Sequence, residues 1–142
     1  MRRLDHYETR LANIPLFRAC SKRDLRAIAR LADYDACQPG EVLVKEGQRG
    51  SELFVIVDGE AEVRRGGKTV ATLGAGDYFG ELAVLHPAPR TATVVATTEM
   101  DVLIVTPREL TVLLADVPLL ARKLLAGMAS RIQESDARSS AA

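Results

Sequence analysis

Apolar positions along this chain change their spacing twice, and the changes divide the sequence into three zones. In the first zone Leu25 and Ile28 follow helical spacing. They lie just behind Ser21 and Asp24, which have the S-x-x-D form of a capping box at a helix start. The pattern predicts a short helix from about 22 to 32.

The middle zone consists of short apolar runs separated by turn residues, which is typical of β-strands. Asp58-Gly59 and Gly66-Gly67 are interpreted as hairpin turns, because glycine adopts the positive φ of such turns at little cost. Parallel strands need long crossovers, which these tight turns exclude. The zone therefore predicts an antiparallel β-barrel or jelly roll. The expected strand segments are "EVLVKEG", "ELFVIVDGEAEV", "RRGGKTVATLG" and "TATVVATTEMDVLIV".

The third zone is predicted to hold two helices. The first begins at Pro107, with Thr106 as N-cap and Glu109 as the acid of a second capping box. Pro118 interrupts it, and a second helix follows. An apolar stripe along that second helix is formed by Leu120, Ala121, Leu124, Leu125, Met128 and Ile132. The tail at 136–142 has no such stripe and is predicted to be flexible.

Composition narrows the class of protein. With 142 residues the chain is long enough for one domain, and its 19 basic and 19 acidic residues give no reason to expect nucleic-acid binding. No segment has the length and hydrophobicity of a membrane helix or a signal peptide, which favours a cytoplasmic protein without membrane contact. Two cysteines and the histidines His6 and His86 match no metal or nucleophile motif. We therefore expect no metal, no catalytic residue and no enzyme activity.

The segment "GDYFGELAVLHPAPRTATV" carries the candidate chemistry. A short helix starting near Gly80 would point free amide groups at an anion, and two prolines would turn the chain so that Arg90 reaches the same anion. Glu81 fits a sugar hydroxyl better than a phosphate, because an ionised carboxylate only accepts hydrogen bonds. The alternative is a plain surface ion pair between Glu81 and Arg90. A dinucleotide-binding fingerprint is excluded, since Phe79 stands where its third glycine should be.

"FGELAVLHPAPRTATV" closely resembles the phosphate-binding cassette of cyclic nucleotide-binding domains. That family includes regulatory domains of cyclic-nucleotide-dependent kinases and channels, and the sensor halves of catabolite-activator-type regulators. The resemblance extends over nearly the whole chain. It implies a mainly β fold, an eight-stranded antiparallel barrel or jelly roll with a short cassette helix, N-terminal helices and two C-terminal helices.

The resemblance also implies a role for each site residue. Arg90 would bind the cyclic phosphate, helped by backbone amides, and Glu81 would bind the ribose 2′-hydroxyl. The last helix would close over the base as a lid. The implied phosphate contacts besides Arg90 are Gly80, Thr91 and Ala92, and the implied base contacts are Val63, Leu73, Leu82, Thr91, Met128 and Arg131.

The sequence therefore predicts a sensor domain whose ligand is cAMP rather than cGMP, and whose C-terminal helices rearrange on binding. Thr91 is compatible with either base. The alternative is a degenerate cassette that binds no nucleotide and serves as a protein-interaction module. A second copy of the chain or an effector protein would contact the C-terminal helices. The expected layout is a domain over 1–135, with N-terminal helices at 1–33, barrel at 34–106, cassette at 79–92, hinge and lid helices at 107–135, and the tail at 136–142.

Overall fold

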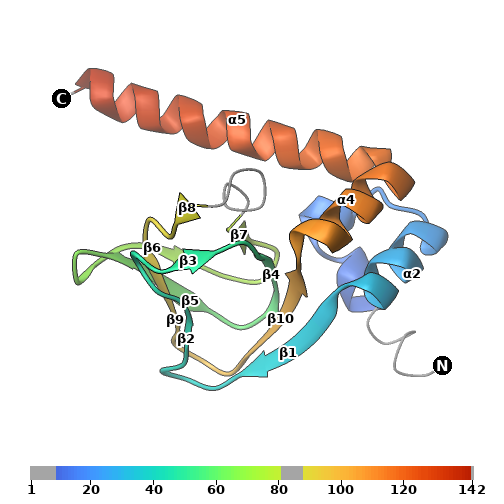
Figure 1. Cartoon of the computed structure of the whole chain (residues 1–142), viewed down its shortest axis with the longest axis horizontal. Helices are drawn as coiled ribbons and strands as arrows, with labels where there is room; N and C mark the ends of the chain where they lie inside the picture. Colours follow the sequence, from blue (N-terminus) through green and yellow to red (C-terminus); the bar gives the residue numbers. More distant parts are fainter. Residues whose placement is uncertain (1–8, 81–87, 142) are drawn as a thin grey trace.

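The computed structural model of the chain describes residues 9–80 and 88–141, except for the side chains of Met128 and of residues 131–141. Helices gather at one end of a β-barrel, and the long last helix runs along its side (Figure 1). The N-terminal helical region comprises a helical segment at 9–12, the short 3-10 helix η1 (Pro15–Phe17) and α2 (Lys22–Leu31). Ser21 and Asp24 form both bonds of the predicted capping box, which confirms the start of α2.

The barrel is built from two four-stranded antiparallel sheets and one two-stranded pair. The orders are β1-β10-β4-β7, β2-β9-β5-β6 and β3-β8. The predicted mainly β jelly roll is confirmed; in place of the eight expected strands, the described residues form ten, because the two-residue strands β3 and β8 add a small pair beside the main sheets. The strand bounds are β1 Asp33–Cys37, β2 Val42–Val44, β3 Arg49–Gly50, β4 Leu53–Asp58, β5 Ala61–Arg65, β6 Lys68–Leu73, β7 Tyr78–Phe79, β8 Ala88–Pro89, β9 Thr93–Ala96 and β10 Met100–Val105.

The two predicted hairpin turns have different outcomes. Gly66 and Gly67 have φ of 59° and 81° and join the paired strands β5 and β6, so this hairpin is confirmed. Asp58-Gly59 was wrong as a hairpin, because β4 and β5 belong to different sheets. The dipeptide instead carries the chain from one sheet to the other, and a side chain on Gly59 would collide with Met100.

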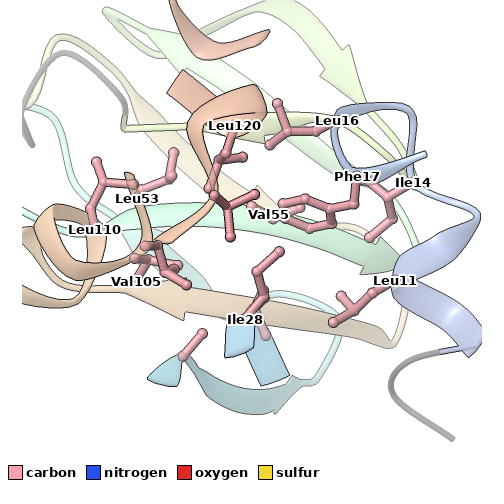
Figure 2. Close-up of a cluster of buried hydrophobic side chains, with 14 of the residues drawn as sticks. Leu11, Ile14, Leu16, Phe17, Ile28, Leu53, Val55, Val105, Leu110 and Leu120 are labelled. Atoms are coloured by element: carbon pink, nitrogen blue, oxygen red, sulfur yellow. The ribbon is translucent and has the colours of Figure 1, made fainter. Parts of the chain in front are cut away.

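Strand β4 has a core on each of its faces, because successive side chains of a strand point to opposite sides. Leu53 and Val55 pack into a cluster with the helices, and Figure 2 shows them beside Ile28, Leu110 and Leu120. Phe54 and Ile56 point into the barrel and pack there with residues of both sheets. This explains why all five residues from Leu53 to Val57 are buried.

The third zone forms α4 (Pro107–Asp116) and α5 (Pro118–Ala141). Thr106 and Glu109 make the predicted capping box, and the break falls before Pro118. The expected end of the last helix at 135 was too early, since α5 continues to Ala141; no glycine or proline follows Gly127 to end it. In the part of the chain that the structure describes, no helix is both long and apolar enough to span a membrane.

Candidate functional site: a buried arginine in a glycine cradle

Arg90 is fixed by its backbone before its side chain makes any contact. It lies between β8 and β9, where its amide donates to the carbonyl of Gln48 at 2.9 Å and its own carbonyl accepts from the amide of Gly47 at 2.9 Å. The short pairing of β3 with β8 holds the same two segments together. These bonds fix the position of Arg90 just before strand β9 of the barrel.

The guanidinium of Arg90 is buried and only partly satisfied. Its side chain is 7% exposed, and Nη2 donates to the carbonyl of Glu52 at 3.1 Å and to the Glu52 carboxylate at 3.2 Å. Its Cζ lies 5.9 Å from the centre of the Phe54 ring, within range of a cation–π attraction. Nε and Nη1 are buried and have no hydrogen-bond partner among the described residues.

Two glycines leave room for this guanidinium. A Cβ added to Gly50 would lie 2.6 Å from Nη2 and 2.8 Å from Cζ of Arg90. At Gly80, where φ is 88°, an added Cβ would lie 2.8 Å from Nη1 and 2.5 Å from the Glu52 carbonyl oxygen. Such separations are shorter than van der Waals contact, so a larger residue at either position would displace the guanidinium or the backbone around it.

The unsatisfied donors give the site its chemistry. Buried polar groups are nearly always hydrogen-bonded, and leaving a charged one without partners costs free energy. An anion with several acceptor oxygens would satisfy Nε and Nη1 together, and arginine suits phosphate in this role. The arrangement is therefore suited to bind a phosphate group.

The acidic side of the site indicates the direction from which an anion can approach. A cavity of about 330 Å³ borders Glu52 and Phe54 and is also lined by Asp35, Glu41 and Cys37. Burial, and next the charge of Glu41, raise the pKa of the Cys37 thiol to about 12, so the thiol stays neutral and the charge of this wall comes from its carboxylates. Three carboxylates disfavour an anion in this cavity, whereas Nη1 of Arg90 lies beside Gly80.

Residues predicted near the base lie on neighbouring strands. Val63 in β5 and Leu73 in β6 are half-buried and pack against the barrel cluster, and Leu73 pairs with Ala61, two residues before Val63. The same strand β5 pairs with β9, in the register Val63 with Val94. The structure thus brings Val63 and Leu73 together on one face of the sheet that continues from Arg90.

The other predicted residues are divided between described and undescribed positions. Thr91 is exposed, and its carbonyl accepts a hydrogen bond from Nε of Arg65 at 3.2 Å, whereas Ala92 is buried. Outside the described residues or side chains lie Glu81, Leu82, Met128 and Arg131, together with the cassette helix expected after Gly80.

Glu52, Phe54 and Gly50 were not identified from the sequence. Glu52 is 38 residues from Arg90 along the chain, and nothing in its local pattern distinguishes it from any acidic residue before a strand. Phe54 lies within the continuous apolar run of β4, where it fits equally well as a core residue. The pairing of β3 with β8, together with the backbone bonds of Arg90 to Gly47 and Gln48, brings this segment next to Arg90.

Comparison with known proteins identifies the family of this chain. Residues 35–116 match the sequence model described as "Cyclic nucleotide-binding domain". The chain is 43% identical over 104 residues to a cAMP-dependent protein kinase regulatory subunit of Mycosarcoma maydis, covering 70% of this chain and 20% of that protein. It is 36% identical over 86 residues to a cGMP-dependent protein kinase of Toxoplasma gondii, covering 61% and 9%. The chain thus spans about a fifth or less of these relatives.

A solved structure shares the fold. The Catabolite Activator Protein of Thermus thermophilus superposes with a TM-score of 0.81 at 27% identity, over 89% of this chain and 62% of that one. The family model covers more than half of the present chain, and its matched region contains Gly50, Gly80 and Arg90. This chain belongs to the cyclic nucleotide-binding domain family.

Proposed function

We propose that this chain binds cAMP as a sensor domain, with the cyclic phosphate on Arg90. The observation that supports it most is the buried Arg90 guanidinium, whose Nε and Nη1 have no partner among the described residues. A singly charged cyclic phosphate offers two free oxygens of the right kind to these donors.

The choice of cAMP over cGMP rests on similarity. The relative at 43% identity is named a cAMP-dependent kinase regulatory subunit, and the cGMP-dependent kinase matches at 36%. Thr91 is exposed beside Arg90, where its hydroxyl is compatible with either base. Selectivity for cAMP is therefore the part of the proposal that needs direct measurement.

The ribose and the base would occupy the space between Arg90 and the β5–β6 hairpin. Glu81 is proposed to accept from the ribose 2′-hydroxyl, with amides of Gly80, Thr91 and Ala92 assisting Arg90. Val63 and Leu73 support the base site, since they lie together on the sheet that continues from Arg90. Leu82, Met128 and Arg131 remain proposed contacts.

A regulatory role requires that the C-terminal helices respond to the ligand. We propose that the break between α4 and α5, where Val117 precedes Pro118, acts as a hinge. A second copy or an effector protein would then contact these helices. Amide hydrogen exchange across 114–124 should change on adding cAMP, and unchanged exchange would refute the hinge.

Calorimetric titration with cAMP, cGMP and 5′-AMP tests the binding proposal. We expect cAMP to bind more tightly than cGMP. Arg90→Ala should weaken cAMP by roughly thirty- to several-thousand-fold, the cost of about 2 to 5 kcal/mol for removing one partner of a buried charge pair.

Arg49→Ala is the matched control, because Arg49 is exposed on the strand paired with β8 and should matter little. Equal losses for the two variants would mean that general positive charge, and not the Arg90 site, attracts the ligand. Tight binding that survives Arg90→Ala would overturn the site. A wild-type protein that binds neither cyclic nucleotide would favour the interaction-module alternative.

A further inference from the structure

Strand β7 has only two residues, and they point in opposite directions. Phe79 faces the barrel interior, where its ring stacks on Phe54 with centroids 4.9 Å apart and planes 5° apart. The Arg90 guanidinium lies over the same Phe54 ring. In the pairing of β7 with β4, Phe79 lies opposite Phe54 and Tyr78 lies opposite Val55. The Phe79 ring and the β7 backbone therefore both contact the strand that carries Phe54, next to Arg90.

Tyr78 faces the other way and packs against the helical cluster. Its hydroxyl lies against Gly127 of α5, so close that an added Cβ on Gly127 would overlap it; the next atom, Cζ, would be 3.1 Å away. In Figure 1, α5 runs past the β7 end of the barrel. The helix backbone can touch Tyr78 only because residue 127 has no side chain.

Glycine at position 127 lowers the stability of the helix, and the contact with Tyr78 explains why a glycine is found there. Gly127 is the only glycine in α5, and glycine is among the poorest helix formers. The position immediately before it, Ala126, is exposed and carries an ordinary helix-forming residue. A residue that weakens the helix is thus found where α5 touches the barrel.

We propose that the contact between Tyr78 and Gly127 docks α5 on the barrel and regulates the nucleotide site through β7. An anion bound to Arg90 shifts the guanidinium and with it the Phe54 ring. The Phe79 ring, which stacks on Phe54, moves as well. Tyr78, the residue next to Phe79, transmits this movement to α5. The docked helix and the bound nucleotide then stabilise each other, since coupling between two sites is reciprocal. The coupling rests on the proposed function, whereas the contact itself does not need nucleotide.

Two readouts on the whole chain test the proposal: hydrogen exchange of peptides from α5 without nucleotide, and calorimetric titration with cAMP. Gly127→Ala should speed exchange in α5 and weaken cAMP at least about fivefold. Helix propensity alone predicts the opposite for exchange, because alanine stabilises a helix. Tyr78→Phe removes the overlapping hydroxyl, so the double variant should recover slow exchange and an affinity within about twofold of Tyr78→Phe alone.

Ala126→Gly is the matched control. It should speed exchange through propensity alone, and Tyr78→Phe should not rescue it. Exchange in Gly127→Ala as slow as in the wild type, or a double variant no better than Gly127→Ala, would overturn the proposal. If the wild type binds neither cAMP nor cGMP, the proposed function and the coupling fail together, while the exchange difference without nucleotide still reports on the contact.

Discussion

Arg10 and Arg90 bind carboxylates near opposite ends of β4, and the two sites differ in how far the protein satisfies each guanidinium. Arg10 donates to the Tyr34 hydroxyl at 2.8 Å and pairs with Asp101 at 3.0 Å and Asp58 at 3.3 Å, with 26% of its side chain exposed. Arg90 is more deeply buried, at 7%, yet its described bonds go only to Glu52.

The difference supports the proposal that Arg10 is a structural arginine and Arg90 a binding one. Arg10 joins residues of β1, β4 and β10 and so holds strand ends together. Among the described residues, Arg90 lacks the full set of hydrogen bonds that would offset the desolvation of its buried charge. A protein tolerates such a deficit where a ligand supplies the missing acceptors, which is why the comparison points to Arg90 and away from Arg10.

The largest expected effect comes from replacing each arginine by methionine. Arg90→Met should weaken cAMP by roughly thirty- to several-thousand-fold. It should leave the free energy of unfolding unchanged or higher without nucleotide, because an apolar side chain of similar volume relieves a buried charge. Arg10→Met should lower that free energy by about 1 to 3 kcal/mol and leave affinity unchanged.

Urea unfolding and calorimetry on both variants measure the two quantities. The assignments would have to be exchanged if Arg90→Met unfolded the protein while Arg10→Met abolished binding. Loss of stability in both variants, with binding kept, would mean that both arginines are structural.

The next largest effect tests the two glycines, Gly50 and Gly80, that form a cradle around the Arg90 guanidinium. Gly50→Ala should weaken cAMP by roughly five- to 150-fold, because an added methyl overlaps the guanidinium and overpacking costs about 1 to 3 kcal/mol. Gly74→Ala is the control: an added Cβ there meets nothing within 4 Å. Equal affinities for the two variants by titration would contradict the cradle.

Local patterns predicted local structure well. The capping boxes at Ser21 and Thr106 and the hairpin at Gly66-Gly67 are confirmed, because each depends on residues within a few positions of one another. Asp58-Gly59 failed as a hairpin for the same reason: a turn dipeptide reverses the chain but does not determine which sheet the next strand joins.

The residues of the functional site show the same difference between local and long-range determinants. Arg90 could be proposed from the sequence because the cassette pattern is local, whereas Glu52 and Phe54 come next to it only through the fold. The Tyr78–Gly127 contact joins residues 49 positions apart in the chain, and nothing in the local sequence around either residue predicts it. Glu81 stays a prediction, since it lies outside the described residues.

A smaller effect is expected from the carboxylate of Glu52, which Arg90 contacts. Glu52→Gln keeps an oxygen acceptor for Nη2 and removes a negative charge beside the proposed phosphate site. Because the Glu52 side chain is 43% exposed, solvent screens its charge, and cAMP should bind about two- to fivefold more tightly. Titration at low and high salt should show this gain shrinking with salt. Weaker binding at both would mean that Glu52 positions Arg90 and its charge is required.

The smallest effect, on stability, is expected from replacing Glu62. Its carboxylate pairs with a third arginine, Arg64, at 2.9 Å near the surface. Hydrogen bonds from Arg64, and next from Thr69, hold the pKa of Glu62 below its ordinary value of 4.5. A depressed carboxyl pKa stabilises the fold above the ordinary pKa, and this contribution is lost as pH falls through the folded-state pKa. Urea midpoints of Glu62→Gln should therefore lie slightly below those of the wild type at pH 7 and converge with them as the pH falls below 4.5. A difference that persists at low pH would show that Glu62 acts by packing and not by its charge.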